Sequence, residues 1–122
     1  MKKKFILLLS VFFALLLASF SGIYVFSRHM LNSDAAMAIA LTLADEVNEN
    51  GVIDEKEINN YITRLVENSR IHADISTPDS PKDLFGSDFK VIMSENKVTC
   101  SSPGLFGRFF SAKHSADIKS KN

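Results

Sequence analysis

Residues 2–29 read KKKFILLLSVFFALLLASFSGIYVFSRH. Three lysines come first, an uncharged and mostly apolar run covers residues 5–26, and Arg28-His29 closes the segment. A helix of about 20 apolar residues crosses the hydrocarbon core of a bilayer, so this run is long enough to span it once. Lysines that precede a span favour the cytoplasmic side. We therefore expect a single-pass anchor at residues 1–29 in the inner (cytoplasmic) membrane, with a cytoplasmic N-terminus and a periplasmic or otherwise extracytoplasmic C-terminal part.

A cleaved signal peptide is the alternative interpretation of this segment, because signals also begin with a basic region and an apolar core. Ser19-Phe20-Ser21 before Gly22 has the small-x-small pattern of a cleavage site. Signal cores, however, run to only about 7–15 residues, so the length favours an anchor that is retained. Both interpretations place the remainder of the chain across the membrane.

The composition limits what the exported part can be. The chain has 122 residues, which leaves about 90 after the anchor, enough for one small domain. Lys and Arg total 14, as do Asp and Glu, but four of the basic residues belong to the anchor segment. Ten basic against 14 acidic residues then remain, which argues against nucleic-acid binding. Cys100 is the sole cysteine, so no disulfide forms within the chain. We expect a buried thiol on a strand, with an intermolecular disulfide as the alternative.

Helical periodicity dominates the first half of the exported part. Asn32-Ser33-Asp34 is a cluster of capping residues, and residues 35–47 should form a helix that ends at Gly51. Residues 54–69 have the pattern of a second amphipathic helix. The apolar stripe of the first helix consists of Ala36, Ile39, Ala40, Leu43 and Val47.

From residue 71 the period changes from helical to alternating. Residues 71–75 fit a short strand, and alternation over 89–93 and 98–100 around Ser94-Glu95-Asn96 indicates a hairpin. The fold class is therefore expected to be α+β, with helical segments packed on a small antiparallel sheet of three or four strands. The exported domain should cover residues 30–110, and residues 111–122 are expected to be a flexible polar tail.

Two C-terminal segments carry more specific patterns. Residues 80–89 read SPKDLFGSDF, and residues 98–109 read VTCSSPGLFGRF, followed by Ala116-Asp117-Ile118. Together they resemble the C-terminal region of the major pseudopilin of type II secretion systems. The matching residues are Pro81, Lys82, Asp83, Gly86, Ser102, Gly104, Gly107 and Phe109, with Phe85 in place of Trp and Phe89 in place of Tyr. Asn50-Gly51 also lies where that family has a turn after its Ala-containing helix.

The resemblance implies a pilin-like fold and a non-enzymatic role in assembly, with other membrane or pilin-like subunits as partners. The residues expected to shape the turns are Pro81, Lys82, Asp83, Phe85, Gly86, Gly104 and Gly107. Independently of the family, Asp83 can accept backbone amide bonds before a tight turn, and Gly86 permits a positive φ.

The chain departs from the family at specific positions. Phe106 stands where the family has an Asp that contributes to a calcium site, and Phe cannot ligate a cation. Lys4 precedes Phe5 where the family's leader has a Gly before its cleavage point. Leu9 falls where the family has a Glu.

An EF-hand-like segment offers a different cation site. Residues 46–57 place oxygen ligands at the spacing of a calcium loop, with Gly51 at the sharp turn. The candidate ligands are Glu46, Asn48, Asn50, the Val52 carbonyl, Asp54 and Glu57. The alternative is a helix-turn-helix in which Asp54 and Glu57 form a capping box. A membrane-tethered calcium-binding module is thus the second interpretation of the chain.

Other chemistry lacks a motif. The three histidines have no Cys or Glu partners at zinc-ligand spacing, and no nucleophile motif or phosphate loop is present. We expect no enzymatic activity, no small-molecule substrate and no cofactor other than calcium. The apolar residues of 105–110 are expected to pack on the sheet, with an exposed partner-binding patch as the alternative.

Overall fold

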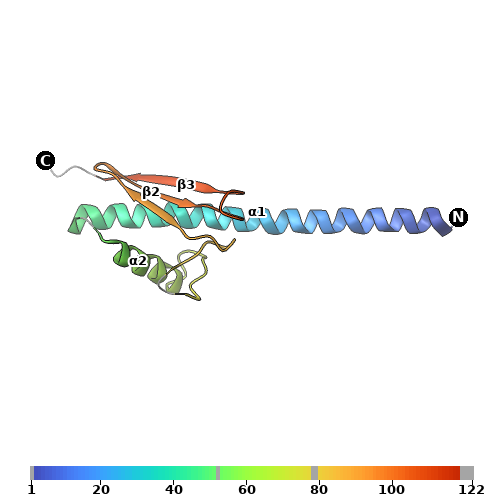
Figure 1. The fold of residues 1–122 in the computed structure, drawn as a ribbon, viewed down its shortest axis with the longest axis horizontal. Coiled ribbons are helices and arrows are strands. Elements are labelled where there is room, and N and C mark those ends of the chain that lie inside the picture. Colours follow the sequence, from blue (N-terminus) through green and yellow to red (C-terminus); the bar gives the residue numbers. More distant parts are fainter. Residues whose placement is uncertain (1, 52, 78–79, 119–122) are drawn as a thin grey trace.

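The computed structural model describes residues 2–51, 53–77 and 80–118 (Figure 1). Two helices are followed by a three-stranded antiparallel sheet with the strand order β1-β2-β3. The elements are α1 (Lys2–Asn50), α2 (Glu55–Glu67), β1 (Lys90–Met93), β2 (Lys97–Ser102) and β3 (Ala112–Asp117). The expected α+β class is confirmed, and the arrangement of a long apolar helix with a small antiparallel sheet is loosely pilin-like.

Helix α1 is one uninterrupted rod of 49 residues. It contains no proline and only Gly22 as a weakening residue, whereas Leu and Ala, which favour helix, are frequent. It ends at Gly51, which has a φ of 84° and donates its N–H to the Val47 carbonyl at 2.9 Å. This is a left-handed C-cap, as the Asn50-Gly51 pair predicts.

The predicted helix start at residues 32–34 is wrong. Asn32 lies within α1 and is fully buried, so the apolar N-terminal helix runs into the domain without a break. No Gly or Pro precedes Asn32 closely enough to stop the helix. Its side chain accepts a hydrogen bond from the Leu84 N–H instead of capping a helix. The apolar segment of residues 5–26 and the sheet domain therefore share one helix, and no linker separates them.

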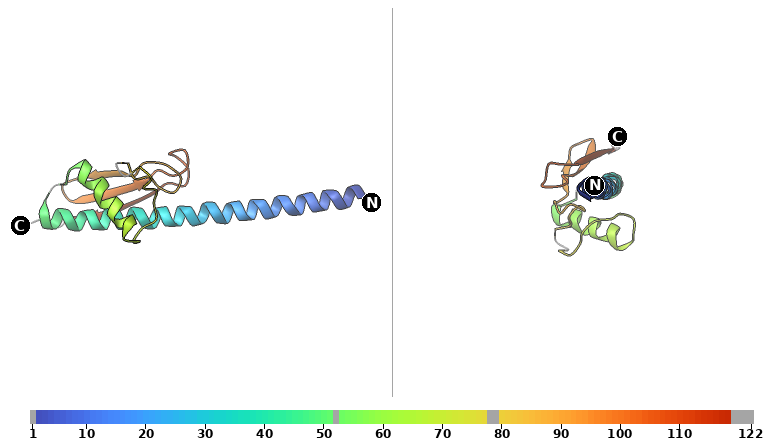
Figure 2. Two further views of the ribbon diagram at one scale, coloured as in Figure 1. Left: turned by 90° about the horizontal axis from the view of Figure 1, so that it is seen from below. Right: turned by 90° about the vertical axis from the view of Figure 1, so that its right-hand side faces the viewer.

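The core forms along the C-terminal half of α1. The apolar stripe predicted there is confirmed, because its residues from Ala36 to Leu43 are buried and Val47 packs against them. Strands β2 and β3 pack on this half of the helix, and α2 lies on a different side of it (Figures 1 and 2). The other core residues are Ala35, Ala44, Ile53, Ile62, Leu65, Ile71, Val98, Cys100 and Ala116.

The N-terminal half of α1 projects away from this domain without any contact that buries it (Figure 2). Its most apolar 18-residue window has a mean hydropathy of 2.5 and is 0% buried. By length and composition, this helix is able to cross a membrane.

The sheet confirms one sequence prediction and corrects two. The hairpin around Ser94-Glu95-Asn96 is present, with Met93 opposite Val98. Residues 71–75 form no strand of their own, since only Asp74 makes an isolated bridge, to Lys82. The expected flexible tail is also wrong for residues 112–117, which form β3; residues 119–122 lie outside the described residues.

Strand β3 is hard to recognise because its inward residues are small or polar. Its alternating burial places Ala112, His114 and Ala116 toward the helix. The His114 Nε2 atom lies 2.7 Å from the Ser33 hydroxyl of α1, in hydrogen-bonding contact. A strand whose core face reads Ala-His-Ala carries little of the apolar alternation that predicts strands.

Candidate functional site

A buried carboxylate joins the two segments that carry the C-terminal motifs. Asp83 is 0% exposed, and each of its oxygens accepts two hydrogen bonds. Oδ1 accepts from the backbone N–H groups of Phe85 and Ser87, at 2.9 and 3.0 Å. Oδ2 accepts from the Ser102 hydroxyl and the Gly104 N–H, at 2.7 and 2.9 Å. We call Asp83, these four donors and the loops that hold them the Asp83 junction.

The four bonds decide what Asp83 can do. Burying a carboxylate is costly unless its oxygens are paired, and here the bonds supply that pairing. Because both oxygens are committed to donors of this chain, Asp83 is a structural group and not a free acid, base or metal ligand. The two amide bonds to Oδ1 are of the kind that Asp83 is expected to accept before a tight turn.

Two glycines make the junction possible. Gly86 has a φ of 87° and donates its N–H to the Asp83 carbonyl at 3.0 Å, which closes the turn under the carboxylate. Gly104 has the same φ, and a Cβ there would overlap the backbone carbonyl oxygen of Phe109. The Gly104 carbonyl also accepts the Ser87 hydroxyl at 2.6 Å. Gly86 therefore requires glycine for its conformation, and Gly104 requires it for both conformation and space.

Helix α1 contacts the Asp83 junction through Arg28 and Asn32, which the sequence did not identify as part of this site. The Asn32 Oδ1 atom accepts the Leu84 N–H at 2.8 Å, and an Arg28 guanidinium N–H points to the Leu84 carbonyl at 3.4 Å. Among the described residues, Asn32 Nδ2 and Arg28 Nε are buried without a hydrogen-bond partner. The helical spacing of the sequence could have placed Asn32 on the buried face, because it continues the apolar stripe one turn before Ala36.

The remaining predicted turn residues lie around the junction. Pro81 is buried, and the Lys82 ammonium pairs with Asp88 at 2.8 Å on the surface. The Phe85 ring lies 6.1 Å from the ring of Phe110. Gly107 has a φ of 73° in the following loop, where a Cβ would meet open space.

Cys100 is a core residue of β2, as expected. It is 0% exposed, and burial raises the pKa of its thiol to about 12. A thiol held protonated in this way is a poor nucleophile and a poor metal ligand.

The aromatic loop, residues 105–110, does not pack on the sheet, which overturns the sequence expectation. Phe106 is 81% exposed, and Phe109 and Phe110 are each 49% exposed. The loop folds back on itself instead of on β2, because Leu105 and Phe109 exchange backbone hydrogen bonds at 2.8 and 3.0 Å. It lies at the end of the sheet nearest the apolar half of α1 (Figure 1).

The EF-hand-like segment is partly helical. Glu46, Asn48 and Asn50 belong to α1, and the Asn50 side chain donates to Glu46 Oε1 at 2.6 Å. Val52 lies outside the described residues. Asp54 is the N-cap of α2, and its Oδ1 accepts the Glu57 N–H at 2.8 Å, so this half of the predicted capping box is present.

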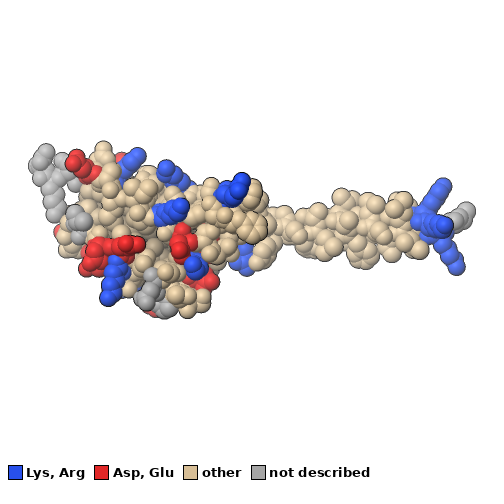
Figure 3. Space-filling model, in the orientation of Figure 1, with Lys and Arg blue, Asp and Glu red and all other residues tan. Residues whose placement is uncertain are grey.

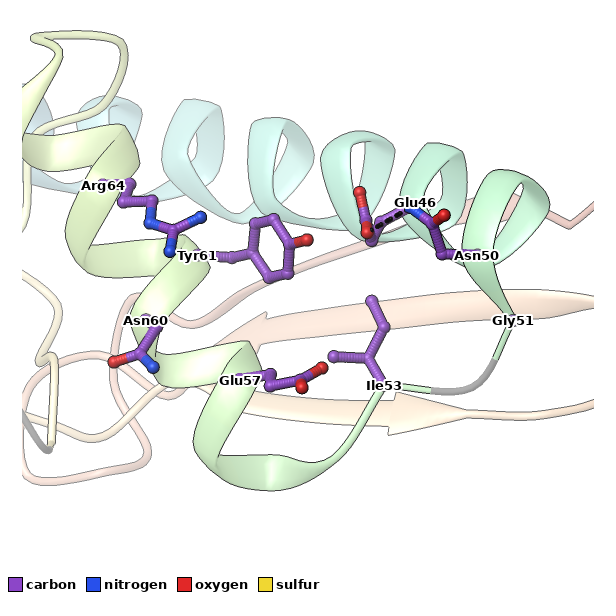
Figure 4. A pocket seen from close by; sticks show the side chains of 8 residues that line it. All are labelled: Glu46, Asn50, Gly51, Ile53, Glu57, Asn60, Tyr61 and Arg64. Atoms are coloured by element: carbon purple, nitrogen blue, oxygen red, sulfur yellow. Dashed lines mark hydrogen bonds between the residues drawn. The ribbon is translucent and has the colours of Figure 1, made fainter.

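Three of these candidate ligands nevertheless surround one cavity between α1 and α2 (Figure 4). The cavity measures about 560 Å³ and is lined by Glu46, Asn50, Gly51, Ile53, Glu57, Asn60, Tyr61 and Arg64. Figure 4 shows the Tyr61 hydroxyl directed toward Glu46. A hydrogen bond to the Glu46 side chain is the main cause of a raised Tyr61 pKa.

Within residues 2–51, 53–77 and 80–118, no group of three or more His, Cys, Asp or Glu side chains is arranged to hold a metal ion. His29 and His114 contact the Phe110 carbonyl and Ser33 respectively.

Comparison of this chain with family models, with curated proteins and with solved structures found no match.

Proposed function

We propose that this chain is a non-enzymatic, membrane-anchored, pilin-like assembly or accessory protein of a secretion or pilus system. In this proposal the N-terminus is cytoplasmic, α1 crosses the inner membrane once, and the sheet domain stands in the periplasm or an equivalent extracytoplasmic space. Its partners are other membrane or pilin-like subunits that pack beside α1.

The observation that carries the proposal is the division of α1 into two halves. The C-terminal half is the core of a folded domain. The N-terminal half, by contrast, exposes the apolar side chains of residues 5–26 along its length. Figure 3 shows charged residues at the N-terminal end of α1 and on the domain, and the part of the helix between them shows no charged side chains. A rod with this distribution needs a bilayer or neighbouring apolar helices around its exposed half.

The Asp83 junction supports the pilin-like part of the proposal. Asp83, Ser102 and Gly104 all belong to the resemblance with the major pseudopilin, and they come from its two separate segments. Their side chains and amides meet in one hydrogen-bonded unit. Residues that match a family pattern and also depend on one another physically support the resemblance better than scattered identities would.

Topology and processing test the membrane part. An alkaline phosphatase reporter fused after Asn122 should be active, and the fusion should remain in membranes after carbonate extraction. A soluble mature protein that begins near Gly22 would show that residues 1–21 are a cleaved signal and would overturn the anchor.

A photoreactive amino acid at Leu16 tests the assembly part. Leu16 is 37% exposed on the apolar half of α1, so it should crosslink to a second copy or to another helical membrane subunit. Crosslinks to lipid alone, in cells that express the whole chain, would argue against assembly through this helix.

Calcium binding is the second candidate function, and one observation favours it. Glu46 and Glu57, the first and last positions of the EF-hand-like segment, line the same cavity although they lie on different helices. Two carboxylates facing one space can provide hard oxygen ligands for calcium. Thermal melts with and without millimolar calcium separate this candidate from a purely structural helix-turn-helix.

A further inference from the structure

The aromatic loop exposes apolar surface that the folded domain does not use. Phe106 is 81% exposed, and Phe109 and Phe110 add half of their own surface beside it. Soluble domains seldom leave several large apolar side chains together in water unless something covers them.

The conformation of the loop is fixed by its own backbone. Leu105 and Phe109 pair through two backbone hydrogen bonds, and the Gly107 N–H bonds to the Gly104 carbonyl at 3.1 Å. Phe106 and Phe110 adopt φ values of 56° and 57°, which bulky residues rarely take. The loop thus holds Phe106 outward at a conformational cost, which is typical of a residue placed for contact.

The loop is attached to α1 directly beyond the apolar run. The Phe110 carbonyl lies 3.0 Å from His29 Nδ1, and the two rings are 6.2 Å apart. His29 follows Phe26 by three residues, which is a rise of about 4.5 Å along a helix. The headgroup layer on each side of a bilayer core is about 5–7 Å deep. With residues 5–26 in the hydrocarbon core, the loop would lie at the depth of the headgroups.

Neighbouring residues suit that depth. An apolar groove of about 400 Å³ continues from the span to the loop, lined by Ser21, Gly22, Val25, Phe26, His29 and Phe110. Arg28 stacks on the Tyr24 ring at 4.3 Å, and Arg108 lies 5.2 Å from the Phe109 ring centre. Tyr is enriched at membrane interfaces, and Phe is typical of the apolar side of segments that lie in them. A neighbouring arginine can extend its cation toward the phosphates.

We propose that the aromatic loop inserts into the extracytoplasmic headgroup layer of the bilayer that holds α1. Phe106 and Phe109 enter the boundary between headgroups and acyl chains, acyl chains fill the groove, and Arg108 pairs with lipid phosphate. The domain is thereby seated on the membrane at a second point beside α1. This inference rests on the retention of α1 as an anchor, and continuity of the groove with the apolar run favours lipid over a second copy of the chain.

The test uses the whole chain reconstituted in vesicles of phosphatidylcholine and phosphatidylglycerol. In a Cys100→Ala background, an environment-sensitive fluorophore is attached at Phe106→Cys, at Glu95→Cys or at Phe13→Cys. Glu95 is the matched control, because it is exposed at the hairpin turn, about 20 Å along β2 from the loop. Phe13 reports whether α1 is inserted. Lipids that carry a spin label near the headgroup end of the acyl chain serve as quenchers.

We expect the spin-labelled lipids to quench the fluorophore at position 106 several-fold more than the one at 95, with blue-shifted emission at 106. Quenching at 13 but not at 106 would overturn the loop insertion and leave the anchor intact. A shielded fluorophore at 106 that loses its shielding when the chain is diluted with lipid would assign the loop to contacts between copies and also overturn it. Absence of quenching at both 13 and 106 would overturn the anchor, and the loop insertion with it.

Discussion

The Asp83 carboxylate accepts a 2.7 Å hydrogen bond from the Ser102 hydroxyl, 19 residues further along the chain, and both residues are fully buried. The bond ties the loop before β1 to the end of β2. Because Asn32 holds the adjacent Leu84 amide from α1, the same contact fixes the loop, the sheet and the helix to one another. The junction is therefore expected to contribute much of the domain's specific stability.

Replacing Asp83 with Ala should destabilise the sheet domain by at least about 3 kcal/mol, because four donors lose their acceptor inside the protein. Denaturant unfolding of the full chain in micelles, followed by circular dichroism, measures the change. Asp88→Ala is the control: the Asp88 side chain is 65% exposed and pairs with Lys82 on the surface, so its loss should cost at most about 1 kcal/mol. Equal effects of the two substitutions would contradict the role of the junction.

The two glycines of the second segment should respond differently to the same substitution. Gly104→Ala places a Cβ against the backbone oxygen of Phe109, which cannot move without opening the aromatic loop. We expect a loss of more than about 3 kcal/mol. Gly107→Ala meets open space at a φ of 73°, so it should cost only about 1 kcal/mol. Thermal unfolding that ranks Gly107→Ala as the more harmful change would show that the loop is packed differently.

Local patterns in the sequence predicted the parts of the fold that depend on local physics. The Ala-rich stripe of residues 36–47, the C-cap at Gly51 and the Asp54 N-cap all appear in the structure. Each is set by residues within a few positions of one another. The same holds for the hairpin around Glu95, whose strands alternate in a recognisable way.

Long-range contacts decided the features that the sequence did not predict. The local sequence predicts that Asn32 is a helix cap. Its actual hydrogen bond is to the Leu84 N–H, 52 residues away, which no local pattern indicates. Strand β3 has too little apolar character to be recognised, and it forms because β2 offers it a paired edge. Phe106 reads as core by composition, yet the backbone of the aromatic loop turns it outward.

Cys100 should be unreactive in the folded protein. Burial raises the pKa of its thiol from 9.0 to about 12, so almost no thiolate is present at pH 8. A maleimide should label the unfolded chain at least 100-fold faster than the folded one, as mass spectrometry of timed samples would show. Comparable labelling rates in the two states would place the thiol at the surface.

The same pKa shift predicts a pH dependence of stability. The folded state keeps the Cys100 proton between about pH 9 and 12, where the unfolded chain loses it, so this thiol's contribution to stability falls as the pH rises through that interval. Cys100→Ala should remove that part of the decline. An identical slope above pH 9 in the wild type and the variant would show that other groups cause it.

Calcium separates the two interpretations of residues 46–57. The first three candidate ligands are helical, and Asp54 is occupied as the N-cap of α2, so we expect millimolar calcium to leave the melting temperature unchanged. Glu57→Gln keeps the N–H that bonds to Asp54 and should cost at most about 1 kcal/mol. Thermal melts with calcium, and with magnesium as the control cation, measure both effects. A saturable rise in melting temperature that calcium causes, magnesium does not, and Glu57→Gln abolishes would establish a real site, because a ligand that binds only the folded state stabilises it by mass action.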